Sequence, residues 1–424
     1  MTTSTKTIIL SLVLSLGSLV LMSQTKQFWS GELKTGVMNL PITIDLTLSE
    51  DTIAVLGSPS QTKETFKAKK VCLRNDSLLV SVNLGLSKVV FKGAYITSDS
   101  ISGTFTQGGQ SMPLSLVRKD SQKTINRPQE PKDINYVCEN VSFSVEGVDY
   151  QFGGTLTYPA EGENFPAIIM LSGSGLQNRD EEIFQHKPFA VIADYMARNG
   201  IAVLRFDDRG WGTQNADLLN ATTLDYVKDA LAAFDLLKTH PKIDHKRIGF
   251  AGHSEGGMIA PIAASSNKDV AFVILLAAPG VNGMEVLIEQ NKAILSKMNY
   301  SKEQIDEQVQ KIRSRDASMG LQGKWFKCFL DLEPKDYLSR LSIPVLALGG
   351  EKDLQVVASQ NLSAIEQTLK QAGNRHFKVL SLPNLNHLFQ ECESGLPDEY
   401  FSIEQTISPK VLEIMRDFID EYVR

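Results

Sequence analysis

The sequence predicts an α/β fold with a doubly wound, mostly parallel sheet, preceded by a small all-β sandwich or barrel domain. Residues 24–119 contain short segments in which apolar residues occupy every second position, with Gly, Asn, Asp and Ser between the segments. This pattern is typical of half-buried antiparallel strands. Residues 137–424 instead alternate continuous apolar strands with amphipathic helices, as in a parallel sheet covered on both faces. A chain of 424 residues is long enough for both domains.

The chain begins with the features of a secretory signal peptide. Lys6 precedes an apolar run from Ile8 to Met22, and small or polar residues follow. We therefore predict a signal peptide over residues 1–23 and a secreted or periplasmic protein. An uncleaved anchor helix is the alternative, but the run is short for a bilayer span and contains several serines. No later stretch is long and apolar enough to cross a membrane, so no span is expected after the signal is removed.

The composition favours a small or neutral substrate. Asp and Glu number 49 against 43 Lys and Arg, and no basic stripe stands out, which argues against a nucleic-acid partner. The cysteines show no metal-ligand spacing, so neither a metal nor another cofactor is expected. Free, buried thiols are expected, because the separation of Cys328 and Cys392 alone cannot support a disulfide between them. The four cysteines are Cys72, Cys138, Cys328 and Cys392.

The first domain carries no chemistry that the sequence identifies. Residues 24–119 lack histidine and any cluster of acidic and nucleophilic groups. We expect this domain to pack on the second one or to shape access to it, and glycan binding is an open alternative. Residues 120–136 are polar, contain Pro128 and Pro131 and have no periodic apolar pattern, so we predict a linker there.

The second domain contains a serine in a turn that favours nucleophilic chemistry. Ser254 lies in "GHSEGG", between the buried strand "RIGFAG" and the small-residue helix "GGMIAPIAASS". A serine presented at the tip of a strand-to-helix turn is strained, and glycines two residues before and after it let the backbone pass without a Cβ clash. We predict that Ser254 is a nucleophile. A helix N-cap serine without chemistry is the alternative.

A serine nucleophile needs a base, and the base needs an orienting acid. Reactive groups of a doubly wound sheet lie at the carboxyl ends of its strands, and His387, in "LSLPNLNHLFQ", is the only one of the six histidines predicted to lie there as a base. His253 is expected to point into packing. The remaining histidines, which lie elsewhere, are His186, His240, His245 and His376. Asp353 follows the strand "IPVLALGG" and is predicted to accept the Nδ1 proton of His387, in preference to its competitor Glu351.

The order Ser254, Asp353, His387 is the nucleophile, acid, base order of α/β-hydrolases. With the motifs GHSEGG, GGEKD and NLNH, residues 137–424 resemble the α/β-hydrolase fold. The loops "LSGSGLQNRDE" and "LRFDDRGWGTQ" are similar to those of bacterial serine esterases of the dienelactone hydrolase and prolyl-oligopeptidase-like branch. The resemblance implies a serine hydrolase that forms an acyl-enzyme.

Acyl transfer also needs hydrogen-bond donors for the developing oxyanion. One predicted donor is the N–H of Glu255, the residue after the nucleophile. The other is expected from the "SGSG" loop, at the N–H of Ser174, with Gly173 and Gly175 clearing space around it. Many relatives begin this loop with His-Gly, where this chain has Ser172 and Gly173.

The loop "FDDRGWG" is charged and lies at the same predicted edge of the sheet. Asp207, Asp208 and Arg209 are expected to hold neighbouring loops together rather than to contact the substrate. Trp211, in contrast, is expected to line the substrate pocket.

Residues 280–341 form an insertion that is longer than a simple crossover helix requires. Helical periodicity in "MEVLIEQNKAILSKM" and in "SKEQIDEQVQKIRSR" resembles the helical cap of many α/β-hydrolases. Trp325, Phe326 and Phe329 then either line the pocket below the cap or pack within the cap, and the sequence leaves both interpretations open.

The predicted function is that of a serine carboxylesterase for short, acetyl-type acyl groups on a small-molecule or carbohydrate ester. The export signal motivates this choice of substrate. A serine aminopeptidase or other peptidase on the same fold is one alternative, and it would need a carboxylate pair for the substrate amine. A non-catalytic glycan-binding protein is another, although all three members of the triad are present in the sequence. The oligomeric state does not follow from the sequence.

Overall fold

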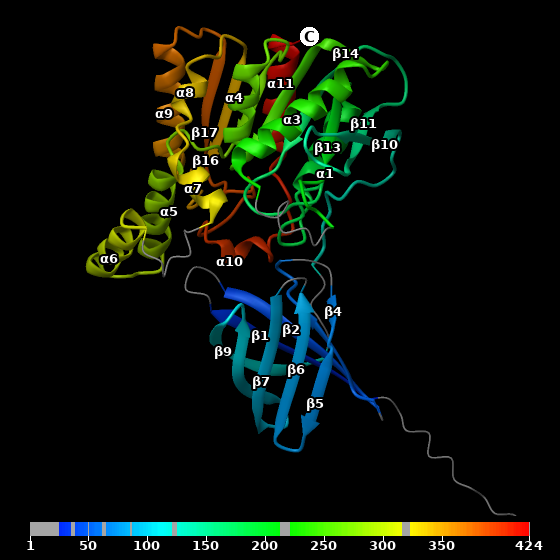
Figure 1. The fold of residues 1–424 in the computed structure, drawn as a ribbon, viewed down its shortest axis with the longest axis vertical. Coiled ribbons are helices and arrows are strands. Elements are labelled where there is room, and N and C mark those ends of the chain that lie inside the picture. Colours follow the sequence, from blue (N-terminus) through cyan, green and yellow to red (C-terminus); the bar gives the residue numbers. More distant parts are fainter. Residues whose placement is uncertain are drawn as a thin grey trace, which may run out of the picture.

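The computed structural model describes residues 25–34, 39–49, 51–61, 65–84, 87–120, 125–212, 221–315 and 323–423 (Figure 1). The predicted signal peptide over residues 1–23 lies outside these described residues. No helix within the described ranges is both long enough and apolar enough to span a membrane.

The first domain is one curled antiparallel sheet, which makes it closer to a barrel than to a sandwich of two sheets. In the described part of the chain it has nine strands in the order β4-β3-β2-β1-β9-β8-β7-β6-β5. Its inner face buries Trp29, Ile44 and Phe91 among other apolar side chains. The strands are β1 (Thr25–Lys34), β2 (Asn39–Leu48), β3 (Ile53–Gly57), β4 (Thr65–Lys67), β5 (Lys70–Arg74), β6 (Ser77–Leu84), β7 (Ser87–Thr97), β8 (Ser100–Gln107) and β9 (Gln110–Lys119).

The second domain is built on a mixed sheet with the strand order β10-β11-β13-β12-β14-β15-β16-β17 over the described residues. The hairpin β10–β11 joins β13 antiparallel, and the strands from β13 to β17 pair in parallel. The strands are β10 (Tyr136–Ser144), β11 (Gln151–Pro159), β12 (Phe165–Leu171), β13 (Ala202–Phe206), β14 (Ile243–His253), β15 (Val273–Leu276), β16 (Val345–Gly350) and β17 (Phe377–Leu382).

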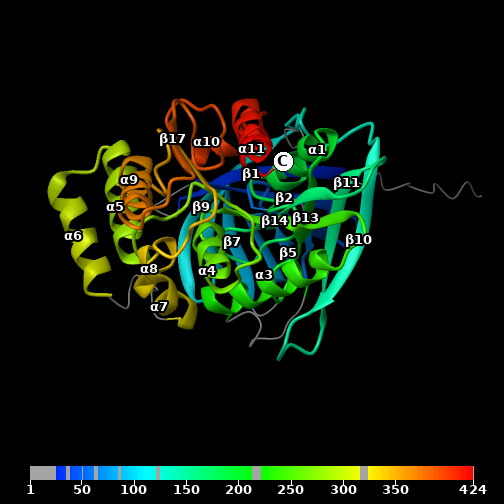
Figure 2. The ribbon, with the colours of Figure 1, turned by 90° about the horizontal axis from the view of Figure 1, so that it is seen from above.

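Helices cover both faces of this sheet (Figure 2). Helices α3 (Thr223–Lys238), α4 (Gly256–Ser266) and α9 (Ala358–Gln371) pack on one face. Helices α1 (Pro188–Arg198) and α11 (Pro409–Tyr422) pack on the other face.

The central strand β12 explains the continuous apolar pattern of the sequence. Ile169 and Leu171 point into the layer with α3 and α4, whereas Ile168 and Met170 point into the layer with α1 and α11. All seven residues of β12 are buried. Since successive side chains of a strand face opposite sides, a strand that is buried on both faces has no polar alternation.

The predicted insertion at residues 280–341 contains helices. They are α5 (Gly283–Lys297), α6 (Lys302–Arg313), α7 (Lys324–Asp331) and α8 (Lys335–Leu338). A capping box begins α6, because Ser301 and Gln304 exchange side-chain to backbone hydrogen bonds. Helices α5 and α6 lie at the side of the sheet, and α7 lies near its carboxyl edge (Figure 1).

The first domain faces this carboxyl edge, where the short helix α10 (Pro397–Tyr400) lies between the two domains (Figure 1). Asn39 of β2 donates a hydrogen bond to Asp398 of α10 at 3.2 Å. The segment between the domains is also anchored. The guanidinium of Arg127 donates to four main-chain carbonyls, those of Phe184, Gln185, Phe401 and Ile403.

The cysteines differ in part from the expectation of free, buried thiols. All four are free, but Cys72 and Cys138 are exposed, and Cys328 and Cys392 are only partly buried. The expectation of burial is therefore wrong. Cys138 lies on the outward face of β10, where exposed and less exposed residues alternate, whereas Cys72 lies on the edge strand β5, none of whose residues is buried.

Gly256, the first residue of α4, gives a test of the packing around Ser254. Helix propensity alone favours alanine at such a position. In the structure, however, a Cβ at residue 256 would lie 2.1 Å from the main-chain oxygen of Leu171. We expect Gly256→Ala to lower the free energy of unfolding by about 1–3 kcal/mol, as for overpacked cores, measured by thermal or denaturant unfolding.

Gly323→Ala is the matched control, because a Cβ there meets no atom within 4 Å. It should unfold like the parent protein. Equal stability of the Gly256→Ala and Gly323→Ala variants would contradict the close approach of α4 and β12.

Candidate active site

Ser254 lies at the turn between β14 and α4, and its backbone is in the left-handed region, with φ of 52°. A positive φ is uncommon for a residue with a Cβ and indicates strain that the surrounding structure holds in place. The N–H of Ser254 donates to the carbonyl of Leu276 at 2.9 Å, and its own carbonyl accepts from Gly257 at 2.9 Å. The turn therefore has the geometry of a nucleophile elbow.

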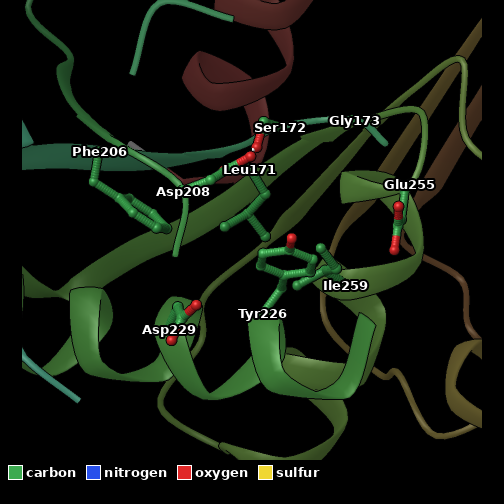
Figure 3. A pocket seen from close by; sticks show the side chains of 9 residues that line it. All are labelled: Leu171, Ser172, Gly173, Phe206, Asp208, Tyr226, Asp229, Glu255 and Ile259. Atoms are coloured by element: carbon green, nitrogen blue, oxygen red, sulfur yellow. Dashed lines mark hydrogen bonds between the residues drawn. The ribbon is translucent and has the colours of Figure 1, made fainter. Parts of the chain in front are cut away.

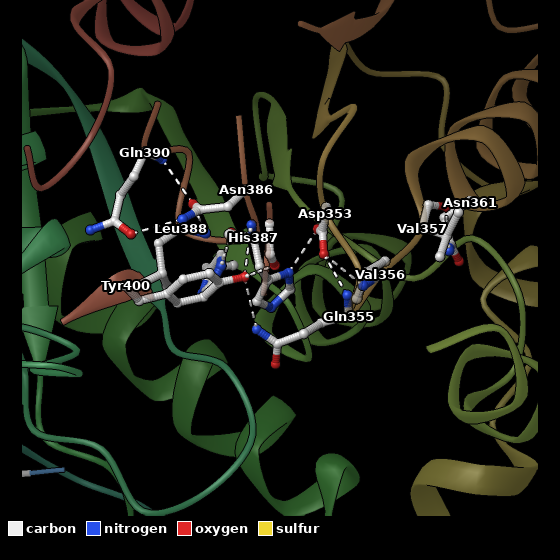
Figure 4. Close-up of polar contacts among 12 residues, drawn as sticks. Asp353, Gln355, Val356, Val357, Asn361, Asn386, His387, Leu388, Gln390 and Tyr400 are labelled. Carbon is white, nitrogen blue, oxygen red and sulfur yellow. Dashed lines mark hydrogen bonds and ion pairs between the residues drawn. The ribbon is translucent and has the colours of Figure 1, made fainter. Parts of the chain in front are cut away.

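His387 and Asp353 form a buried pair (Figure 4). The Nδ1 of His387 lies 2.8 Å from Asp353 Oδ2. The other oxygen of Asp353 accepts the main-chain N–H groups of Gln355 and Val356 at 2.8 and 2.9 Å, so this carboxylate is held by three hydrogen bonds. Glu351, the competitor, is exposed. The arrangement fixes the tautomer of His387 with its proton on Nδ1 and leaves Nε2 as the basic nitrogen.

Ser254 and His387 line the same pocket, which has a volume of about 130 Å³. Within the described ranges no hydrogen bond joins the two side chains, and such contacts are often loose before a substrate binds. The pocket is lined by Gly173, Ser174, Gln177, Glu181, Ile183, Phe184, His253, Ser254, Gln355, His387, Leu388, Pro397 and Tyr400.

The loop after β12 supplies backbone amides beside Ser254. A Cβ added to Gly173 would lie 3.1 Å from the Cβ of Ser254, so only a glycine allows this approach without displacing its neighbour. The N–H of Gly173 donates to Glu181 Oε1 at 2.6 Å. In contrast, the N–H groups of Ser174 and Glu255 have no acceptor among the described residues. These are the two amides that the sequence suggested as oxyanion donors.

The order of strands, the elbow after β14, the Asp353 carboxylate after β16 and the His387 imidazole after β17 together define the fold. The chain has the α/β-hydrolase fold.

Comparison with known proteins agrees with this assignment. Residues 222–392 match the family model described as BAAT / acyl-CoA thioester hydrolase C terminal. This chain is 29% identical over 260 residues to esterase EstD of Thermotoga maritima. The match covers 58% of this chain and 60% of that protein. It is 27% identical over 222 residues to the uncharacterized peptidase YtmA of Bacillus subtilis, covering 51% of this chain and 74% of that protein.

Among solved structures, a dienelactone hydrolase of Anabaena variabilis is 18% identical and matches with a TM-score of 0.44, covering 69% of this chain and all of that one. Acylaminoacyl peptidase of Pyrococcus horikoshii is 14% identical with a TM-score of 0.49, covering 90% of this chain and 62% of that one.

The side chain of Glu255 connects three parts of the α/β-hydrolase domain. Its carboxylate accepts hydrogen bonds from Ser174 Oγ at 2.8 Å, Thr223 Oγ1 at 2.6 Å and Trp325 Nε1 at 2.9 Å. Burial raises the pKa of Glu255, although these three hydrogen bonds oppose the rise. Figure 3 shows Glu255 at the start of α4, beside a second, smaller pocket behind the loop of Gly173. Glu255 thus links the loop after β12 to α3 and to the insertion.

The aromatic residues that were candidates for the pocket lie outside it. Trp325 stacks on Phe329 with ring centroids 5.4 Å apart and meets Phe326 edge-on at 4.5 Å. None of these three rings lines the pocket with Ser254, because Trp325 turns its N–H toward Glu255 and the rings pack within the insertion. Trp211 does not line it either and is 43% exposed.

Hydrogen bonds join the charged loops after β12 and β13, as expected from the sequence. Asp207 binds the guanidinium of Arg179. Asp208 accepts from Ser172 Oγ at 2.5 Å and from the N–H of Gln177 at 2.7 Å, and burial raises its pKa well above the usual range.

Arg209 pairs in the same way with Asp229 of α3 at 2.5 Å. The supporting role of Asp207, Asp208 and Arg209 is confirmed. In the described part of the chain, no group of three or more His, Cys, Asp or Glu residues could hold a metal ion.

The sequence did not predict the pairing of two residues near the site, His253 and Glu181. His253 is buried, as expected, but its ring nitrogens face Glu181 Oε1 and the main-chain oxygen of His387, both at 3.0 Å. Glu181 was visible in the sequence only as part of the charged segment "RDE". No periodicity signals such a pair, because its members are 72 residues apart.

Trp325→Phe tests the connection through Glu255. The variant keeps an aromatic ring for Phe329 but loses the N–H that Glu255 accepts, so we expect the free energy of unfolding to fall by about 1–3 kcal/mol. Chemical denaturation measures the change. Trp211→Phe, at an exposed position, should leave stability unchanged. If both variants were as stable as the parent, the bond from Trp325 to Glu255 would not contribute to the fold.

Proposed function

We propose that this protein is a serine carboxylic-ester hydrolase acting on small esters with short acyl groups. The observation that carries the proposal is that Ser174, Ser254 and His387 line one pocket, while the amides of Ser174 and Glu255 have no acceptor among the described residues. The names of the relatives, an esterase and a thioester hydrolase family, support the same class of reaction. The chain spans 60% of the length of EstD, so the activity is proposed from the site rather than transferred from the relative.

The mechanism follows from the positions of these groups. Ser254 Oγ attacks the carbonyl carbon of the ester while His387 Nε2 takes the hydroxyl proton. Asp353 stabilises the imidazolium that forms, through the bond to Nδ1. The amides of Ser174 and Glu255 donate to the oxyanion of the tetrahedral intermediate. His387 then protonates the leaving alcohol, and water cleaves the acyl-enzyme through the same groups.

The lining of the pocket supports a small, neutral ester. Ile183, Phe184, Leu388 and Pro397 supply apolar walls that suit a short acyl group such as acetyl. None of the described residues that line the pocket is Lys or Arg. Because the phosphates of a coenzyme A thioester call for basic partners, we favour a small-molecule or carbohydrate ester over such a thioester. We also propose export through the signal peptide over residues 1–23.

A peptidase remains the main competitor, and YtmA favours it by name. An aminopeptidase would need carboxylates free to bind the substrate amine. Glu181 is the only Asp or Glu among the described residues that line the pocket, so these residues do not supply the pair of carboxylates that such an enzyme needs. Parallel assays on aminoacyl amides and on acetyl esters separate the two functions. Glycan binding without catalysis becomes the favoured alternative if Ser254 does not react.

Ser254→Ala and Asp353→Asn test the mechanism. With 4-nitrophenyl acetate as substrate, we expect Ser254→Ala to lose nearly all activity. Asp353→Asn should lower kcat by about 10⁴-fold, because an amide in place of the carboxylate stabilises the wrong tautomer of His387.

Glu351→Gln is the matched control at the exposed residue of the same turn, and it should retain parental kcat. Ester hydrolysis by Ser254→Ala at the rate of the parent would refute the serine mechanism.

A panel of esters with graded acyl length tests the substrate class. We expect kcat/KM to be highest for acetyl and propionyl esters, acetylated sugars included, and to fall with long acyl chains that the pocket of about 130 Å³ cannot hold. A preference for long-chain acyl-coenzyme A over acetyl esters would contradict the proposed substrate and leave the triad untouched.

A further inference from the structure

Behind His387 lies a second histidine-carboxylate pair, which the proposed mechanism does not use. Glu181 Oε1 accepts the N–H of Gly173 at 2.6 Å and lies 3.0 Å from His253 Nδ1. His253 Nε2 lies 3.0 Å from the main-chain oxygen of His387. One chain of hydrogen bonds therefore runs from the loop that holds Ser174 to the main chain of the proposed base.

The partners of His253 determine how many protons the pair holds. A carbonyl oxygen accepts hydrogen bonds and cannot donate, so His253 Nε2 must carry a proton toward His387. The contact between Nδ1 and Glu181 needs one further proton between the two groups. The pair as a whole then has no net charge. The shared proton lies either on Glu181, where both groups are neutral, or on His253, which gives an imidazolium beside a carboxylate.

Burial and neighbouring charge favour this charged form. His253 and Glu181 are 7% and 3% exposed, and an isolated charge at such a place would be costly. Burial disfavours the imidazolium, but the charge and hydrogen bond of Glu181 and the carbonyl of His387 outweigh it, so the pKa of His253 is raised. Asp353 adds to the rise, and the ring of His387 is the other titratable group in contact, with centroids 4.8 Å apart.

The backbone around Glu181 indicates that its position is imposed by these contacts. Glu181, Phe184 and Gln185 have φ values of 49°, 53° and 61°, although none is glycine. Such conformations persist only where the surroundings over-determine them, and they cluster at functional sites. Arg127 holds the carbonyls of Phe184 and Gln185 from outside, and the two bonds of Glu181 hold the segment from inside.

We propose that Glu181 and His253 are positioning residues, which as an ion pair hold the main chain of His387 and the loop of Ser174 in register with Ser254. The inference rests on the proposed function, since it assigns a role within the same site. The bond from Glu181 also occupies the N–H of Gly173 and so leaves the amide of Ser174 to face the oxyanion.

Glu181→Gln and His253→Gln test the proposal. Three hydrogen bonds are at stake: from Gly173 to residue 181, between residue 181 and His253, and from His253 to His387. In Glu181→Gln, a neutral amide beside a neutral His253 can make two of these three bonds but not all of them. We expect kcat for 4-nitrophenyl acetate to fall by about 10–10²-fold in both variants, the range for displacements of catalytic groups by up to about 1 Å. KM should change less than two-fold, because neither residue is expected to bind the ester.

His240→Gln is the matched control, since His240 also faces a carboxylate, Glu139, at 3.3 Å and precedes the start of β14, whereas Ser254 follows its end. It should retain kcat within two-fold. A parental kcat in both Glu181→Gln and His253→Gln would overturn the proposal. So would an equal fall in His240→Gln, because the loss would then reflect general instability.

The charge state of His253 is measured on the unaltered protein. A variant is needed only to assign the signal. NMR of protein labelled with ¹⁵N-histidine should show one ring with both nitrogens protonated at pH 7.5, and His253→Gln should lack that signal. A neutral ring for His253 would overturn the ion pair.

The failures of the two proposals are distinguishable. If Ser254→Ala is inactive while Glu181→Gln and His253→Gln keep full activity, the serine mechanism stands and the positioning role fails. If Ser254→Ala remains active, the proposed function fails, whatever the NMR signal of His253.

Discussion

The close approach of three backbone segments around Ser254 is the constraint on which the rest of the site depends. The end of β14, the start of α4 and the loop after β12 come so near that a Cβ at Gly252 or Gly256 would overlap main-chain atoms at about 2 Å. Within this space Ser254 takes a positive φ. Such a conformation persists only where the surroundings hold it, and it presents the side chain at the end of a strand, as the proposed nucleophile requires.

Charged and polar groups behind these segments keep them in place. Asp208 and Asp207 tie the loop after β13 to the loop after β12, and Glu255 ties that second loop to the insertion. Arg127, from the segment between the domains, binds the main chain of Phe184, which lines the pocket, and of Phe401, which follows the lining residue Tyr400. The segment that the sequence suggested as a mere linker therefore supports the pocket. Since Asp208, Glu255 and Arg127 are buried, leaving any of them without hydrogen bonds would be costly, and this cost favours the observed positions of the loops.

The sequence predicts the strand ends well and the contacts between loops poorly. Ser254, Asp353 and His387 each follow a recognisable buried strand, so elimination among a few residue types was sufficient to select them. Trp325 and Trp211 were selected by size and position along the chain, and neither property tells which way a ring points. The pair of Glu181 and His253 depends on a loop path with three positive φ values, which no hydrophobic pattern encodes. The exposed Cys138 shows the same limit, since a one-residue shift of register reverses the face of a side chain.

The central claim is that Ser254 is the nucleophile of this site. The most direct measurement is to react the full chain with a fluorophosphonate and to locate the adduct by intact-mass and peptide mass spectrometry. We expect one adduct per chain, on the peptide that contains Ser254, together with loss of ester hydrolysis. An unmodified Ser254, or an adduct on another residue with hydrolysis unchanged, would contradict it.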